Sequence, residues 1–418
     1  MGDAERCAVE AVWRLESARI VGGLTRVVRD IDLAEQFAHD ALVAALEQWP
    51  RDGVPDNPGA WLMAAARHRA VDWMRRERRE QAHQEDLVRT AAARQEATRE
   101  PDAADGDLGD DALRLMFLCC HPVLPPDART ALTLRLLAGL STEAIARAYL
   151  VPEPTIAQRI VRAKRTLAEQ QVPFELPEGE GLAARLGSVL EVLYLLFNEG
   201  YAATGGDAWT RPDLCEEGLR LVRVLAEQMP REAEVHGLAS LMEIQASRLG
   251  ARHGELGDPV LLLEQDRSQW NQLLIQRGLD ALARAEALGT PPGPYRLQAG
   301  IAACHARAAT AADTAWERIV DLYGRLAEVA PSPIVELNRA VAVAMAFGPQ
   351  VGLFLVESLA RDPALANYHL LPCVRGELLR RLGRLDEARR EFERAAAMTG
   401  NARERQLLAR RAAACEAR

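Results

Sequence analysis

Apolar residues recur along most of the chain at the spacing of one helix face. In DLAEQFAHDALVAALEQW, residues 32–49, this spacing is kept by Leu33, Phe37, Ala41 and Val43 or Ala44. The run is therefore expected to form an amphipathic helix. The next residues, PRDGVPDNPGA, contain three prolines and two glycines, which predicts a loop.

A second long helix is expected from about Pro58 to Arg79. Asn57 can cap its start, and proline suits the first helical position because no N–H is needed there. Residues 81–110 then lose the apolar spacing and end in EPDAADGDLGDD. This composition predicts a flexible acidic linker.

Helical spacing returns over residues 111–172, where Pro125-Pro126 can open a helix. The segment QVPFELPEGEG, residues 171–181, predicts another boundary, and residues 182–418 read as almost continuous helix–turn–helix. Residues 296–418 carry a weak repeat of tetratricopeptide type. Its last unit has the expected small and large residues at Gly376, Leu379, Gly383, Ala388, Phe392 and Ala395.

These patterns predict an all-α protein, and the composition agrees. Of the 418 residues 49% are hydrophobic and only 5% aromatic, and good helix formers dominate. No apolar run approaches the roughly 20 residues that a membrane helix needs, and MGDAERCAVEAVW lacks the apolar core of a signal peptide. Seven cysteines without a repeated spacing favour a reducing cytoplasm over a disulfide framework.

The formal net charge of −9 is unevenly distributed along the chain. Residues 81–110 carry 3 Arg and 8 acidic residues, whereas residues 111–170 carry 8 basic and 5 acidic residues. The acidity therefore does not exclude nucleic-acid binding by the second segment.

The net-basic segment contains STEAIARAYLVPEPTIAQRIVRAKRTL, residues 141–167, which predicts a helix, a short turn and a basic helix. One face of the basic helix is apolar and consists of Ile156, Ile160, Ala163 and Leu167. The opposite face begins at the helix start and consists of Thr155, Gln158, Arg159 and Arg162. Arg and Gln can pair with base edges in the major groove, as in a DNA-reading helix. By itself, the stretch is equally compatible with a solvated helical hairpin.

A second basic helix is WLMAAARHRAVDWMRRERR, residues 61–79, with six Arg and one His within 13 residues and with Trp61 and Trp73. Arg neutralises phosphates, and aromatic rings can stack on unpaired bases. Alone, the segment is equally typical of a core helix with a basic end. Two such basic helical modules joined by an acidic linker indicate nucleic-acid binding more specifically than either module does alone.

With these motifs in this order, residues 10–170 resemble a bacterial sigma factor of the extracytoplasmic-function type, in the sigma-70 superfamily. DIDLAEQFAHDALVAALEQW resembles region 2.2, which docks on the β′ clamp of core RNA polymerase. WLMAAARHRAVDWMRRERR resembles regions 2.3–2.4, which melt and capture the −10 element of promoter DNA. LPPDARTALTLRLLAGLSTEAIARAYLVPEPTIAQRIVRAKRTLAE resembles region 4, which binds the β flap and the −35 element.

The resemblance implies three sets of site residues. Polymerase binding is implied for Asp32, Glu35, Gln36, His39 and Asp40. Binding of the opened −10 element, with a flipped base held by the loop at residues 52–57, is implied for Asp52, Asn57, Trp61, Arg67, Arg69, Arg75 and Arg76. Reading of the −35 duplex is implied for Thr155, Gln158, Arg159, Arg162 and Lys164. The acidic linker would thread the RNA path of the polymerase.

The sequence departs from the family in two places. His68 stands where the family often has Asn, and Leu150, followed by Pro152 and Pro154, replaces a turn that usually contains glycine. A stiffer turn is expected to alter how the basic helix enters the groove.

Residues 182–418 resemble the helical extension of one subgroup of these sigma factors. The matching segments are LYLLFNEGYAATGG, RPDLCEEGLRL, HGLASLMEIQASRLGAR and LLLEQDRSQWNQLLIQRGL, in this order. The resemblance implies a built-in regulator, with a protein or ligand partner and without a membrane anchor. Asn198–Tyr201 and Gln265–Trp270 are candidate interdomain contacts or a ligand pocket.

An enzyme is the remaining hypothesis for the C-terminal half. Acid–base or metal chemistry is open to Glu199, Asp213, Glu216, Glu217, His236, His253, Asp258, Glu264 and Asp266. Helix caps and ion pairs are the alternative interpretation, since no phosphate loop, H-E-x-x-H or nucleophile elbow occurs. Cys119-Cys120-His121 has no second Cys/His pair nearby in sequence for a tetrahedral metal. We therefore expect no catalysis, no metal and no cofactor.

The sequence thus predicts an all-α sigma factor with region 2 in residues 1–80, region 4 in residues 111–172 and a regulatory C-terminal domain. The alternative is a one-component DNA-binding regulator with a tetratricopeptide-like sensor and no sigma activity. The helix resembling region 2.2 argues against that alternative.

Overall fold

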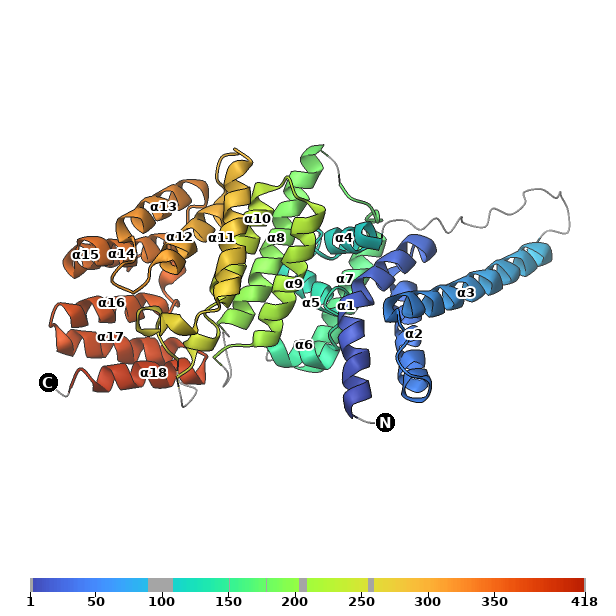
Figure 1. Cartoon of the computed structure of the whole chain (residues 1–418), viewed down its shortest axis with the longest axis horizontal. Helices are drawn as coiled ribbons and strands as arrows, with labels where there is room; N and C mark the ends of the chain where they lie inside the picture. Colours follow the sequence, from blue (N-terminus) through green and yellow to red (C-terminus); the bar gives the residue numbers. More distant parts are fainter. Residues whose placement is uncertain are drawn as a thin grey trace. The chain divides into compact units, whose positions relative to one another are not determined.

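The computed structural model describes residues 3–88, 108–149, 151–177, 179–202, 209–254 and 259–416. Across these residues the secondary structure is helical, with no strand and only one isolated bridge, between His253 and Pro259 (Figure 1). The expected all-α fold is confirmed. None of the described helices combines the length and the apolar character that crossing a membrane requires.

The chain divides into two compact units, Met1–Val192 and Leu193–Arg418. The division falls inside helix α8 (Gly179–Tyr201), whereas the sequence placed a boundary at residues 171–181. The reason is that the first half of α8 packs within the first unit. There the Ser188 hydroxyl donates to the carbonyl of Cys120 at 2.5 Å, and Arg129 reaches Glu191 at 3.0 Å.

The first unit begins with three long helices, α1 (Asp3–Val28), α2 (Ile31–Asp52) and α3 (Pro58–Val88). Each of the three packs on the other two. Asp30 caps α2 by accepting from the backbone N–H of Asp32 at 2.8 Å. The expected cap of α3 is confirmed, because the side chain of Asn57 accepts from the N–H of Ala60 at 3.1 Å.

Two helix ends differ from the sequence-based expectation. α2 continues through Pro50 to Asp52, and α3 continues to Val88, past its expected end at Arg79. Residues 80–88 are rich in Glu and Gln, which favour a helix even without an apolar face. Of the expected linker, residues 81–88 and 108–110 are therefore helical, and residues 89–107 lie outside the described residues.

Four shorter helices follow in the first unit: α4 (Leu108–Cys119), α5 (Pro126–Leu136), α6 (Thr142–Tyr149) and α7 (Glu153–Glu169). α4 packs closely on α1, since a Cβ atom on Gly22 would lie 2.5 Å from the carbonyl oxygen of Asp111. The Asp111 carboxylate is fully buried and pairs with Arg26 at 3.1 Å and Arg114 at 2.8 Å. The helices on both sides of residues 89–107 thus share one core.

The second unit is a succession of helices in which most elements pack on their neighbours in the chain. After the end of α8 these are α9 (Pro212–Gln228), α10 (Ala233–Ala246), η1 (Gly250–Arg252), η2 (Leu262–Glu264), η3 (Arg267–Gln269), α11 (Gln272–Ala287), α12 (Pro294–Arg307), α13 (Trp316–Val329), α14 (Pro333–Phe347), α15 (Pro349–Leu359), η4 (Pro363–Leu365), α16 (Leu370–Arg381), α17 (Leu385–Met398) and α18 (Ala402–Ala413).

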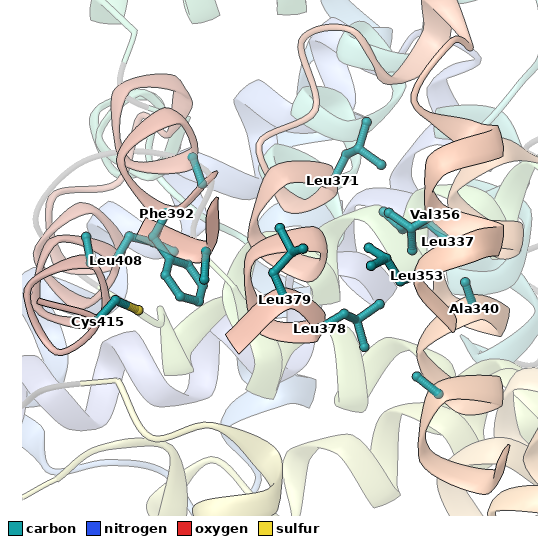
Figure 2. Packing of buried hydrophobic residues seen from close by; sticks show 14 of the residues in the cluster. Leu337, Ala340, Leu353, Val356, Leu371, Leu378, Leu379, Phe392, Leu408 and Cys415 are labelled. Carbon is teal, nitrogen blue, oxygen red and sulfur yellow. The ribbon is translucent and has the colours of Figure 1, made fainter. Parts of the chain in front are cut away.

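The last predicted repeat unit is a helical hairpin of α16 and α17. Gly376 allows the two helices to approach, since a Cβ atom there would lie 3.0 Å from the ring of Phe392. Gly383 makes the turn with φ +76°, a conformation that favours glycine. Figure 2 shows the Phe392 ring between α16 and α18, near Leu379 and Leu408, and Phe392 is fully buried.

Replacing Phe392 with alanine is expected to lower the free energy of unfolding by about 3–5 kcal/mol, because a large ring is removed from a closed core. Urea denaturation of the full chain measures this change. Phe354→Ala is the matched control, since that ring is 71% exposed and its loss should cost little. Equal losses in the two variants would contradict this packing.

Candidate nucleic-acid interface

Helix α7 has the two faces that the sequence predicts. Its apolar stripe is buried and consists of Ile156, Ile160, Ala163 and Leu167. On the other side Gln158 and Arg162 are exposed, and Thr155 and Arg159 are half-buried. α5 and α6 both pack on α7 and hold it with this polar side outward. These four side chains form a polar face that is suited to a DNA groove.

The start of α7 is regular despite its prolines. Pro152 occupies the N-cap position with φ −59° and ψ 140° and makes no side-chain cap hydrogen bond, and Pro154 lies in the first turn. Proline costs little there, because the first N–H groups of a helix have no intrahelical partner. Leu150 lies outside the described residues, and the N–H of Val151 bonds to the carbonyl of Ala146 at 3.1 Å. The prolines of the expected stiff turn therefore leave the first turn of α7 in regular helical geometry.

Arg159 makes one weak contact in its unit. Its Nη2 lies 3.4 Å from Oδ2 of Asp127, at the start of α5, and that carboxylate is 72% exposed. Exposed ion pairs of this kind contribute about 0–1 kcal/mol. Arg159 can therefore exchange Asp127 for a base or a phosphate at small cost.

Lys164 does not lie with the other four side chains predicted to bind the −35 duplex. Its side chain is only 8% exposed, and its Nζ donates to Asp32 at 2.7 Å and to Glu35 at 2.5 Å. Arg135 on α5 also binds Glu35, with 2.5 Å between Nε and Oε1. In this conformation the ammonium of Lys164 cannot reach a phosphate. We call Asp32, Glu35, Arg135 and Lys164 the ion cluster.

The ion cluster joins two sets of predicted residues, since Asp32 and Glu35 belong to the face expected to bind polymerase. The other residues of that face lie on α2 as well, with Gln36 and His39 exposed and Asp40 half-buried. No spacing in the sequence indicates that α7 covers part of this face. Arg135 was not foreseen, because its partner is 100 positions away.

Electrostatics favour the charged forms of Glu35 and Lys164 in the ion cluster. Burial alone would raise the pKa of Glu35, but the charges and hydrogen bonds of Lys164 and Arg135 lower that pKa. Burial alone would lower the pKa of Lys164, but Glu35 and Asp32 raise it. Glu35 and Lys164 therefore both stay charged between the ordinary pKa of Glu, 4.5, and that of Lys, 10.5.

The ion cluster is therefore expected to be insensitive to pH near neutrality. Because the pKa of Glu35 is lowered on folding, its contribution to stability is full above pH 4.5 and is lost as the pH falls through the lower folded value. Hydrogen exchange in α2 and α7 should stay constant from about pH 6 to pH 9, after correction for the intrinsic rate. A rise in exchange within that range that is absent in Glu35→Gln would contradict this assignment.

Helix α3 presents part of its basic set to solvent. Arg75 and Arg76 are exposed, and Arg69 is half-buried, with Nη1 3.4 Å from the carbonyl of Ala65. Both tryptophans of the segment pack on α2, Trp61 edge-on to Trp49 at 5.6 Å and Trp73 near Phe37 at 6.1 Å. These rings are half-buried, so only part of each is open to a base.

The start of α3 borders a cavity of about 430 Å³ that reaches across to α1. Its lining brings together two of the predicted −10 residues, Asn57 and Arg67. Asp52 and Asn57, at the ends of the predicted base-binding loop, are both exposed. The cavity also includes Glu16 and Arg19 of α1, which sequence reasoning missed because no spacing connects α1 with α3.

The residues considered for catalysis or metal binding mostly serve the fold. Glu199 pairs with Arg211 at 2.6 Å, Glu217 pairs with Arg220 at 2.9 Å, and Asp266 caps η3. Asp258 lies outside the described residues. In the part of the chain that the structure describes, no group of three His, Cys, Asp or Glu side chains can hold a metal ion.

Cys119 and Cys120 are buried inside the first unit. Burial raises the pKa of Cys120 to about 12, so this thiol stays neutral at pH 7. Its Sγ lies 3.5 Å from the hydroxyl of Thr133. The pair thus packs as small apolar side chains.

Comparison with known families agrees with this geometry. Residues 14–80 match the family described as Sigma-70 region 2, and residues 114–167 match Sigma-70, region 4. Residues 185–286 match a family of unknown function, DUF6596. The chain is also similar to the Uncharacterized protein R00370 of Rhizobium meliloti (strain 1021), with 43% identity over 394 residues, which cover 93% of this chain and 92% of the relative.

Proposed function

This chain belongs to the sigma-70 family, with regions 2 and 4 followed by a C-terminal extension, and we propose that it is an extracytoplasmic-function sigma factor. In this role it binds core RNA polymerase and directs it to a particular set of promoters. The observation that carries the proposal is the pairing of two basic helices, α3 and α7, on the two family regions. α7 reads the −35 duplex with its polar face, and α3 holds the opened −10 strand.

The cavity beside α3 supports the −10 assignment. A base that leaves the duplex loses its stacking, at a cost of a few kcal/mol, and a protein pocket must offset that loss. The cavity of about 430 Å³ is large enough for a base and is lined by Asn57 and Arg67. We assign the flipped base to this cavity, with the exposed loop before α3 closing over it.

The ion cluster suggests a resting form of the protein. Glu35 is 17% exposed and gives both its oxygens to Arg135 and Lys164, so it is not open to a polymerase subunit in this form, whereas Asp32 gives Lys164 one oxygen and stays largely exposed. We infer that the conformation with the ion cluster formed is the unloaded state. Binding to core polymerase then requires α7 to leave α2, which also frees Lys164 for the DNA backbone.

The C-terminal extension is proposed to regulate these steps. Its support is the match to DUF6596 directly after region 4 and the repeat-like succession of helices that follows. Helical repeats of this kind offer extended surfaces for partners. A one-component regulator without sigma activity is the competing function, and co-purification with core polymerase followed by run-off transcription separates the two.

A further inference from the structure

A cavity of about 430 Å³ lies within the second unit, where α10, α12, α13 and the start of α14 meet. Its volume is in the range of small-molecule sites. Part of its wall is apolar, with Leu241, Ile301 and Leu326 among the lining residues. No Asp or Glu is found among the described residues that line it, and Arg248 is its one permanently charged side chain.

The Arg248 guanidinium is buried without a matching negative charge. The residue is 8% exposed, and its one hydrogen bond to a described residue goes from Nη2 to the side-chain oxygen of Gln245 at 3.2 Å. Within the described residues its Nε has no hydrogen-bond partner, and Arg248 forms no ion pair with a carboxylate. The nearest aromatic faces, Tyr201 and Trp270, are both 5.8 Å from the guanidinium carbon. An uncompensated buried charge of this kind is costly.

Two neighbouring arginines are better compensated than Arg248. Arg267 donates from Nη1 to the carbonyls of His305 at 2.5 Å and Ala308 at 2.7 Å. Arg252 lies 3.9 Å from the centre of the Tyr201 ring, where a cation is attracted by the aromatic face. Neither of these two arginines lines the cavity. Of these three arginines, Arg248 is therefore the one that brings an uncompensated positive charge to the cavity.

The positive field also acts on His305, which lines the same cavity. Burial, followed by the charges of Arg248 and Arg267, lowers the pKa of His305 to about 4. At pH 7 the imidazole is therefore neutral, and its Nδ1 has no hydrogen-bond partner within the described part of the chain. Burial raises the pKa of Tyr323, another lining residue, to about 12, which indicates poorly hydrated surroundings.

We propose that this cavity binds a small organic acid, with its carboxylate on Arg248 and its apolar body against Leu241, Ile301 and Leu326. A guanidinium presents two parallel N–H groups that match a carboxylate. One negative charge balances one arginine, whereas a dianionic phosphate would call for further cations. Leu241, Ile301 and Leu326 offer surface to the hydrocarbon part of such an acid, and Gln298, Ser332 and Asn338 of the same lining can bind a further polar group on it.

The experiment compares acids with neutral analogues of the same shape, using the full-length protein. Benzoate and octanoate are titrated against benzamide and octanamide at pH 7.5 and constant ionic strength, and thermal unfolding is recorded. At least one acid should raise the Tm saturably, because a ligand that binds only the folded state stabilises it. Its amide should have little effect, and inorganic phosphate should bind more weakly than the acid.

Variants locate the site. Arg248→Met should weaken the binding of the acid by at least about 10-fold, and Arg248→Lys should give an intermediate loss because one donor pair is removed while the charge stays. Arg277→Met, at an exposed arginine of α11 in the same unit, should bind like the wild type. Equal effects of acids and amides on the wild-type chain would overturn the proposal even if Arg248→Met did not fold. Tighter binding of phosphate, or undiminished binding by a folded Arg248→Met, would do the same.

Discussion

Promoter-specific transcription is expected to fall by about 30-fold or more when Arg159 and Arg162 are both replaced by alanine, while binding to core RNA polymerase stays near the wild-type value. Each lost pair of hydrogen bonds to a base edge costs about 1–3 kcal/mol, and every 1.4 kcal/mol is a factor of ten. Arg162 is exposed and Arg159 holds only Asp127, so little of the fold depends on either. Run-off transcription measures the loss, and a pull-down of core polymerase measures what is retained.

A binding assay separates base reading from simple charge neutralisation. If the two arginines read bases, the double variant should lose the difference in affinity between a cognate and a scrambled −35 duplex. If they only contact phosphates, both duplexes should weaken alike and the salt dependence should become shallower by about 0.9 per lost contact. Arg277→Ala, on the second unit, serves as the control for overall charge. Specific transcription by the double variant at the wild-type level would refute the −35 assignment.

Reversing the charge of Lys164 is expected to tighten binding to core polymerase. In Lys164→Glu a third carboxylate meets Asp32 and Glu35, and breaking a buried ion pair costs about 3–5 kcal/mol. The equilibrium should therefore move toward the open form by at least about 100-fold. Apparent affinity rises with the fraction of protein that is competent to bind, so the gain is limited by the closed fraction in the wild type.

Two measurements test this prediction. Hydrogen exchange should increase in α2 and α7 of Lys164→Glu, and the affinity for core polymerase should rise by a factor no larger than the shift in the equilibrium. Arg165→Glu is the matched control, since Arg165 lies next in the chain, is 77% exposed and, among the described residues, pairs only with Glu169 on its own helix. If the two variants bound core polymerase equally, the ion cluster would have no part in controlling access to α2.

The structural features that the sequence predicts correctly are those that depend on local spacing. The apolar stripe of α7, the Asn57 cap of α3 and the hairpin around Gly376 and Phe392 all depend on residues within a few turns of one another. Helical periodicity reports such neighbours directly. The fold class and these elements were therefore predictable.

Contacts between distant segments were not predictable in this way. Lys164 falls within the basic run of α7, and only the packing of α7 against α2, 129 positions earlier in the chain, identifies its partner Glu35. Trp61 and Trp73 look free in a basic segment, but they pack on α2. The division inside α8 has the same origin, since Ser188 and Glu191 in its first half contact Cys120 and Arg129, which lie far earlier in the chain. A single sequence carries no signal for such pairings.

The burial of Lys164 has a chemical consequence. Lys164 is the only lysine in the chain, so it supplies the one side-chain amine that an acylating reagent can modify. Such reagents attack neutral amines in contact with water, and this amine is covered and is held in its charged form by two carboxylates. Mass mapping can follow the acylation of Lys164 separately from that of the terminal amine. The rate of acylation at Lys164 would then report the fraction of molecules in which α7 has left α2. The protein thus carries its own single-site reporter of the open state.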